Sequence, residues 1–186
     1  MLRILLLRLC LCLCLPAAVL AANAGPLVIV GGGRTPRSVH RTFLELGGGK
    51  QAVLAVLPQA SNRPDRGQAS VELFLKLGAA EASIVELDDP KRARGQLEKA
   101  TAIWFPGGSQ ARLYAALRQS GLLECLRDRH QGGVPFGGTS AGAAIMSKIM
   151  ITNSPKTTGL RQGNTPVAQG LGLADRLIID QHFVAR

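Results

Sequence analysis

Aromatic residues and cysteines are scarce in this chain of 186 residues, which has one Trp, one Tyr and five Phe. Hydrophobic residues still make up 46% of the chain, so we expect one domain with a core built mainly of aliphatic side chains. Three of the four cysteines fall within the first 24 residues, which leaves Cys125 alone and excludes an internal disulfide framework. No cluster of His, Cys and Asp has the spacing of metal ligands, so we expect no metal and no cofactor.

Acidic residues are also few, with 12 Asp and Glu against 22 Lys and Arg and a net charge of +10. A basic balance can indicate binding to nucleic acid or to an anionic surface. The basic residues are scattered here, their densest group at residues 91–94 contains no aromatic residue, and we therefore expect no nucleic-acid partner.

The first 24 residues have the pattern of an export signal. Arg3 and Arg8 precede a Leu/Cys/Ala run that ends in Ala22-Asn23-Ala24, an A-x-A cleavage site. The apolar run is too short to span a membrane comfortably. We therefore predict cleavage after Ala24, a secreted or periplasmic domain over residues 25–186, and no membrane association after cleavage.

The rest of the chain alternates short apolar runs with amphipathic segments. We expect strands at residues 26–30, 52–57, 82–87, 101–105 and 134–136, and helices at 38–46, 68–77, 94–100, 112–129 and 141–146. This alternation predicts an α/β fold of three layers, with a mainly parallel sheet and helices on both faces. The loops after the first, second, fourth and fifth strands should meet at one edge of the sheet.

Two further segments bear on the fold and on ligand binding. Residues 152–169 are rich in small and polar residues and predict a long loop, followed by a strand at 177–179. The run Gly31-Gly32-Gly33 after the first strand invites a dinucleotide interpretation, but the fingerprint needs a Gly where the chain has Pro36. We therefore set nucleotide binding aside.

The stretch Gly138-Thr139-Ser140-Ala141-Gly142 matches the pattern G-x-S-x-G. A strand before it and a small-residue helix after it are the context of a nucleophile elbow, in which a sharp turn exposes the Ser. The alternative is a glycine-rich turn with an incidental Ser. An oxyanion site would need two backbone N–H groups, for which Ala141 is one candidate and Gly107 or Gly108 is the other.

A nucleophilic Ser needs a base, and the chain offers three histidines. His40 lies on an early helix, where it is expected to be solvated or packed against its own helix. His130 lies at the end of a helix, where a His is favourable against the helix dipole. His182 follows an apolar run downstream of Ser140 and is the candidate base.

Three ordered blocks carry a family resemblance: residues 105–113, 138–144 and 180–183. They resemble the signature blocks of the cyanophycinases, serine peptidases of family S51 whose fold is similar to class I glutamine amidotransferases. The resemblance implies hydrolysis of cyanophycin, a polyaspartate with Arg on each side-chain carboxyl, to β-Asp-Arg dipeptides. It also suggests a homodimer.

The resemblance further implies roles for single residues. Ser140 would be the nucleophile and His182 the general base. Gln110 and Gln181 would bind the aspartyl part of the substrate, and Arg186 would be the first of several basic residues in the substrate site.

The sequence departs from the family pattern in three places. No Glu lies between Ser140 and His182, where the family has its triad acid, and the expected place falls near residues 157 and 158, which are both Thr. The only acids in that interval are Asp175 and Asp180. Ser109 stands where the family has Asp, and the chain ends at residue 186, so we expect the fold to be incomplete at its C-terminus.

These observations leave three hypotheses. The first is a serine-type exopeptidase that resembles cyanophycinase, with a cyanophycin-like polypeptide as substrate. The second is a related peptidase that acts on acidic dipeptides such as α-aspartyl peptides. The third is a catalytically impaired or inactive fragment of the family, which the absent Glu and the end of the chain favour.

Overall fold

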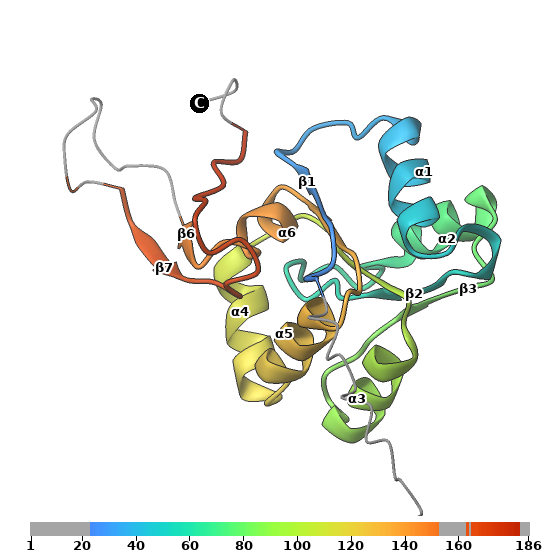
Figure 1. Ribbon diagram of the computed structural model, residues 1–186. Helices are drawn as coiled ribbons and strands as arrows, with labels where there is room; N and C mark the ends of the chain where they lie inside the picture. The colour runs from blue at the N-terminus through green and yellow to red at the C-terminus, as the bar shows by residue number, and fades with distance from the viewer. Residues whose placement is uncertain (1–22, 153–162, 164, 183–186) are drawn as a thin grey trace, which may run out of the picture.

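The structure is a computed structural model that describes residues 23–152, 163 and 165–182 (Figure 1). The signal segment predicted for residues 1–24 lies almost entirely outside the described residues. Within the described part of the chain, no helix is long and apolar enough to cross a membrane.

Five strands form a parallel sheet in the order β1-β5-β4-β2-β3. They are β1 (Leu27–Val30), β2 (Val53–Val56), β3 (Glu81–Ile84), β4 (Ala102–Phe105) and β5 (Phe136–Thr139). Because the strands are parallel, the loops that follow β1, β2, β4 and β5 lie at the same edge, as the sequence predicts. The predicted α/β fold with a mainly parallel sheet is confirmed.

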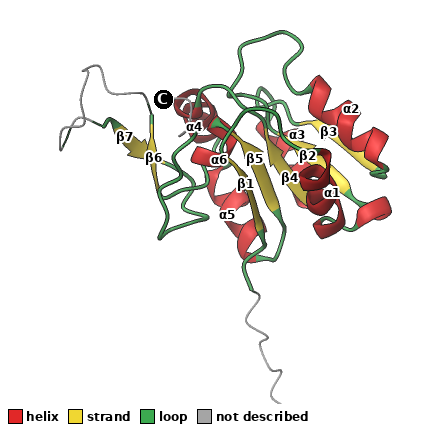
Figure 2. Cartoon of the chain, turned by 90° about the horizontal axis from the view of Figure 1, so that it is seen from above, coloured by secondary structure: helices red, strands yellow, loops and turns green. Residues whose placement is uncertain are grey.

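Helices cover both faces of the sheet (Figure 2). They are α1 (Arg37–Leu46), α2 (Gln68–Leu77), α3 (Pro90–Lys99), α4 (Gln110–Gln119), α5 (Leu123–Gln131) and the short α6 (Ala141–Ala144). Side chains alternate between faces along a strand, so Leu54 and Val56 pack with α1 and α2, whereas Ala55 packs with α3, α4 and α5. This alternation gives the three layers.

Three of the aromatic residues form a cluster on one face of the sheet. Phe43 of α1, Phe74 of α2 and Trp104 of β4 have ring centroids 5.1 to 5.7 Å apart, and all three are buried. His40 joins this cluster, 5.4 Å from the Trp104 ring. Its burial lowers the pKa of its imidazole, more than its backbone hydrogen bond raises it. His40 is therefore a core residue and not a solvated one.

The helix predicted over residues 112–129 is wrong as a single element. The structure has two helices, α4 and α5, separated by a turn in which Gly121 has φ of +69°. A left-handed residue cannot continue a right-handed helix, and Gly adopts that conformation at little cost. The helix α3 also begins earlier than predicted, at Pro90, where the Asp89 side chain caps it by accepting from the N–H of Arg92.

The C-terminal region also departs from the sequence prediction. No strand forms at residues 177–179. Instead β6 (Ile149–Ile151) pairs in antiparallel fashion with β7 (Val167–Gln169), whose residues fall inside the predicted long loop. Most of that loop, residues 153–162 and 164, lies outside the described residues.

After β7 the chain runs back toward the main sheet. The N–H of Leu171 donates to the carbonyl of Ile145 at 2.7 Å, and the N–H of Ile179 donates to Ser147 Oγ at 3.1 Å. The Arg127 Nε of α5 donates to the Leu171 carbonyl at 2.9 Å. Further along, the N–H of His182 donates to the Gly31 carbonyl at 2.8 Å, which places this residue next to the end of β1.

Glycines in β5 and α6 permit close packing. A Cβ atom on Gly142 would overlap the carbonyl oxygen of Phe105, and one on Gly138 would lie 2.5 Å from the carbonyl oxygen of Gly142. The flanking glycines of the G-x-S-x-G pattern are therefore required where β4, β5 and α6 meet.

We expect Gly142→Ala to lower the free energy of unfolding by about 1–3 kcal/mol, because the added methyl group must displace the backbone of β4. The matched control is Gly95→Ala in α3, where an added Cβ meets nothing within 4 Å. That variant should gain about 0.5–1 kcal/mol from helix propensity. Urea unfolding of the two variants measures both values, and an unchanged stability of Gly142→Ala would contradict the packing argument.

Candidate active site

Ser140 lies in the sharp turn between β5 and α6. Its φ and ψ are 54° and −118°, and it is one of two non-glycine residues with positive φ in the described part of the chain. The turn is held from both sides, since the N–H of Ser140 donates to the Val30 carbonyl at 2.9 Å and its carbonyl accepts from Ala143 and Ala144 at 3.0 Å. This strand, strained turn and helix match the geometry expected of a nucleophile elbow.

His182 is the side chain in position to act as a base. Its Nε2 lies 2.8 Å from the Oγ of Ser140, although 41 residues separate them in the chain. The backbone of His182 is the second positive φ, at 56°, and its N–H donates to the Gly31 carbonyl at 2.8 Å. The histidine is thus positioned by a contact with the loop after β1.

The glycine run after β1 supports this imidazole. A Cβ atom on Gly32 would overlap the His182 ring, 2.7 Å from Nε2. From the sequence, the loop that contains Gly31-Gly32-Gly33 is expected at the edge of the sheet where the site lies, but its contact with His182 is not predicted. The signal that could have revealed it is the glycine run itself, which permits a side chain to lie directly on the backbone.

Gln181 also contacts Ser140. Its side chain is buried, and its Oε1 lies 2.9 Å from the Ser140 Oγ. One hydroxyl proton cannot serve both Gln181 and His182. Rotating the amide by 180° exchanges Oε1 and Nε2, lets Nε2 donate to Oγ, and leaves the hydroxyl proton for His182.

The two glycines proposed for an oxyanion site have different neighbours. A Cβ atom on Gly107 would lie 3.4 Å from the Ser140 Cβ, so this residue lies directly against the elbow. Gly108, with φ of +143°, lies instead against the carbonyl of Ala60 in the loop after β2. Of the two, Gly107 therefore has the position next to Ser140, and Ala141 follows the Ser in the chain.

The other residues predicted for the site are Gln110, Arg186 and the triad acid. Gln110 is buried and its Nε2 donates to the backbone carbonyl of Ile151 at 2.5 Å, which ties the start of α4 to β6. Arg186 and the two threonines at 157 and 158 lie outside the described residues.

The other histidines do not belong to this site. His130 is buried at the end of α5, its ring centroid 5.6 Å from that of Phe136. Burial lowers the pKa of its imidazole, and the backbone hydrogen bond with Gly25 opposes this more weakly. No group of three or more His, Cys, Asp or Glu residues that could hold a metal occurs in the described ranges.

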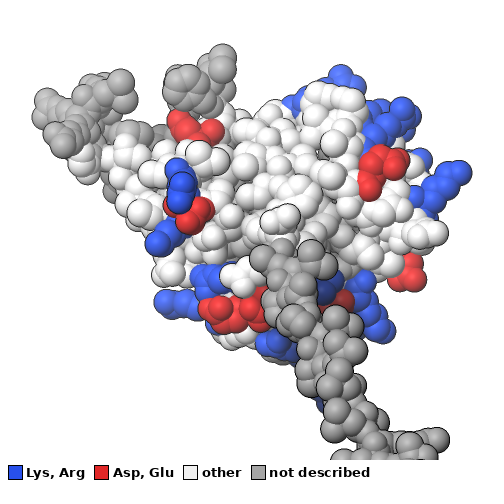
Figure 3. Space-filling model, in the orientation of Figure 1, with Lys and Arg blue, Asp and Glu red and all other residues white. Residues whose placement is uncertain are grey.

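Charged side chains lie at the margins of the face seen in Figure 3, over α1 and α2 and around α3 and α5. Lys and Arg are interspersed there with Asp and Glu, and the centre of this face is uncharged. The separate basic groups match the scattered distribution expected from the sequence.

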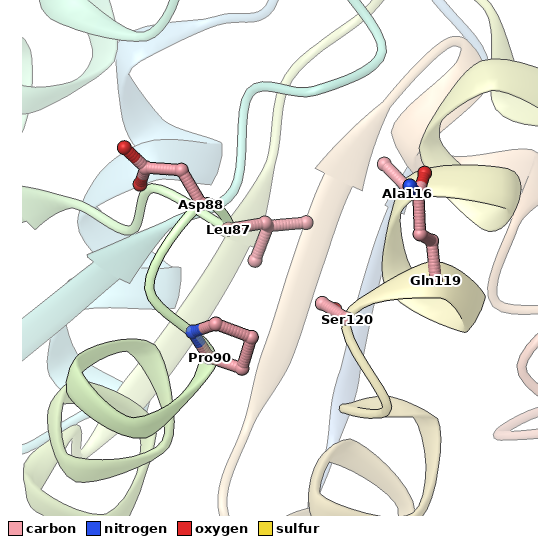
Figure 4. Close-up of a pocket in the computed structure, with 6 residues that line it drawn as sticks. All are labelled: Leu87, Asp88, Pro90, Ala116, Gln119 and Ser120. Atoms are coloured by element: carbon pink, nitrogen blue, oxygen red, sulfur yellow. The ribbon is translucent and has the colours of Figure 1, made fainter.

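Two cavities lie beside the loops after the strands. The one with a volume of about 260 Å³ is lined by Gly107 and by the loop between β2 and α2. The other, of about 410 Å³, lies between the loop after β3 and the end of α4 (Figure 4). None of the residues that line the second cavity contacts Ser140 or His182, so only the first adjoins the candidate active site.

The chain is similar in sequence to a family of peptidases. The profile of Peptidase family S51 matches residues 27–185. A cyanophycinase of Geminocystis herdmanii is 33% identical over 169 residues, which are 84% of this chain and 61% of the relative. A cyanophycinase of Thermosynechococcus vestitus is 32% identical over 173 residues, which are 88% of this chain and 54% of the relative.

Solved structures share the fold. A peptidase from an acI-B1 actinobacterium superposes with a TM-score of 0.62 at 21% identity, over 88% of this chain and 70% of that one. A putative peptidase E from Listeria monocytogenes also gives 0.62, at 18% identity, over 82% of this chain and 76% of that one.

The chain spans about half to three fifths of the length of the curated cyanophycinases it matches. The profile match covers all five strands of the sheet, the serine elbow and His182. On this evidence the chain belongs to peptidase family S51.

Proposed function

We propose that this protein is an exported serine-type exopeptidase that hydrolyses cyanophycin to β-Asp-Arg dipeptides. The observation that carries the proposal is the 2.8 Å contact between Oγ of Ser140 and Nε2 of His182 at a strained strand–helix turn. The curated relatives named cyanophycinase supply the substrate class.

In the proposed reaction, Ser140 Oγ attacks the backbone carbonyl carbon of an aspartyl residue while His182 Nε2 takes the hydroxyl proton. The carbonyl oxygen becomes an oxyanion and accepts hydrogen bonds from the N–H groups of Gly107 and Ala141. His182 then donates the proton to the leaving nitrogen as the C–N bond breaks. Water, activated by the same histidine, hydrolyses the acyl-enzyme.

Gln181 and Gln110 have distinct places in this proposal. Gln181 contacts Oγ directly, so we assign it to holding the hydroxyl and the aspartyl group beside it. The Nε2 of Gln110 donates to the Ile151 carbonyl of β6, and we propose that this orients the amide oxygen of Gln110 as an acceptor for the substrate. By the family resemblance, we also assign Arg186 to the substrate site.

The family resemblance gives the triad a Glu between the Ser and the His, and no Glu lies between Ser140 and His182. Removing the orienting acid of a triad costs about 10⁴ in kcat, so an enzyme without one would be slow. Here the Gly31 carbonyl fixes the backbone of His182 and Gly32 supports its ring. We therefore propose that packing against the β1 loop contributes to orienting the imidazole.

Incubating the protein with cyanophycin should release β-Asp-Arg, which chromatography with mass detection measures. Ser140→Ala should lower the release by at least about 10³-fold. A panel of α-aspartyl dipeptides distinguishes the alternative dipeptidase, which would cleave them and leave cyanophycin intact. A folded protein that releases nothing from either substrate is the inactive fragment.

A fluorophosphonate probe tests the nucleophile without any assumption about substrate. We expect it to label Ser140, and we expect His182→Asn to slow labelling by at least about 10²-fold because the hydroxyl loses its base. Ser83→Ala, at an exposed serine of β3, is the matched control and should label like the parent protein. Equal labelling of His182→Asn and the parent would disprove the assigned base.

Export and assembly complete the proposal. We propose that residues 1–24 direct secretion or transfer to the periplasm and that the exported domain forms a homodimer. Expression in a bacterial host should yield an exported protein whose first residue is Gly25, whereas a variant starting at residue 25 should stay in the cell. N-terminal sequencing of each fraction measures this, and an exported protein that retains Met1 would refute cleavage.

A further inference from the structure

The cavity of about 260 Å³ beside Gly107 has no role in the mechanism above. It lies at the carboxyl edge of the sheet, between the loop that follows β2 and the turn that follows β4. Its polar lining comes from Ser61, Arg63, Asp65, Arg66 and Ser70. Gly107 belongs both to its wall and to the surroundings of Ser140.

The order of the strands decides which part of a substrate this cavity would face. Ser140 follows β5, which lies between β1 and β4. His182 lies on the β1 side, through its contact with Gly31, and Gly107 lies on the β4 side. Because His182 delivers its proton to the leaving nitrogen, the leaving group lies on the β1 side. The cavity is on the opposite side and faces the acyl part.

The charged side chains that line the cavity form ion pairs. Arg63 and Asp65 make a two-point fork, with Nε–Oδ1 and Nη2–Oδ2 distances of 2.9 Å, and both side chains are more than half exposed. Arg66 pairs with Glu86 at 2.5 Å. The Arg63 guanidinium, chiefly through its hydrogen bond, lowers the pKa of the Asp65 carboxyl, so this group is charged at neutral pH. A lining with both signs of charge matches a ligand that carries both.

We propose that this cavity binds the zwitterionic arginyl branch of the substrate residue on the acyl side, with Asp65 accepting hydrogen bonds from its guanidinium and Arg63 donating to its free carboxylate. This inference rests on the proposed function for the identity of the substrate. A guanidinium and a carboxylate match in a planar, two-point geometry, so the branch can take over both halves of the Arg63–Asp65 fork. Exchanging an exposed ion pair for an equivalent one costs little, because exposed pairs contribute little to stability.

The size of the cavity fits one branch of the substrate. Sites for whole drug-sized ligands have volumes of about 300–1,000 Å³. The present cavity is smaller. It therefore suits a single amino-acid side branch, with the aspartyl backbone remaining at Ser140.

Isothermal titration with two dipeptides tests this assignment without requiring turnover. The ligands are β-Asp-Arg and β-Asp-citrulline, which has a neutral ureido group in place of the guanidinium. We expect the parent protein to prefer β-Asp-Arg and Asp65→Asn to weaken its binding about 10-fold while leaving β-Asp-citrulline unchanged. Asp88→Asn is the matched control, because Asp88 is an exposed loop acid that lines the other cavity, and it should change neither affinity.

A second variant tests the carboxylate half. Arg63→Gln should weaken the binding of β-Asp-Arg. It should leave the binding of β-Asp-Arg-amide, which lacks the arginyl carboxylate, unaffected. Equal weakening of both ligands by either variant, or no weakening, would overturn the assignment. Circular dichroism confirms the fold of each variant.

Labelling of Ser140 separates this inference from the proposed function. If the probe labels Ser140 but the parent protein binds neither dipeptide at millimolar concentration, the cavity assignment is wrong and the nucleophile stands. If binding depends on Asp65 but no labelling occurs, the cavity assignment stands and the proposed catalysis is wrong.

Discussion

The hydrogen bond from the His182 N–H to the Gly31 carbonyl is the contact on which the candidate site depends. It joins the end of the described chain to the end of its first strand, and β1 pairs with β5, whose last residue precedes Ser140. Three segments far apart in the sequence therefore meet within one hydrogen-bonded unit. A Gly at position 32 is part of the same constraint, because any side chain there would overlap the imidazole.

The sheet order then distributes the neighbours of the nucleophile. β5 is flanked by β1 and β4, so the loop after β1 supports the histidine and the turn after β4 places Gly107 against Ser140. The loop after β2, one strand further out, lines the cavity beside Gly107. The loops after β4 and β2 thus line the site at increasing distance from Ser140. This arrangement follows from parallel strands, whose carboxyl ends share one edge.

The sequence was sufficient for the parts of this arrangement that have a local signal. Alternating apolar runs and small-residue turns predicted the parallel sheet, and the G-x-S-x-G pattern predicted the turn at Ser140. The break at Gly121 was missed because the apolar periodicity continues through it, and the β6–β7 pair was missed because its strands have only three residues each. No local pattern predicts contacts between segments that are distant in the sequence. The support of His182 by Gly32 depends on such a contact, and so do the different neighbours of Gly107 and Gly108.

Ser140 and His182 also share a property that distinguishes them from every other non-glycine residue of the described chain, a positive φ. A residue held in such a conformation costs about 1–3 kcal/mol and persists only where its surroundings determine it. At Ser140 the determinants are the hydrogen bond to Val30 and the tight packing of Gly142 on β4. At His182 the determinant is the Gly31 carbonyl. The two strained residues are also the two whose side chains meet at 2.8 Å, so the rest of the fold compensates for strain at the point where the chemistry requires a fixed geometry.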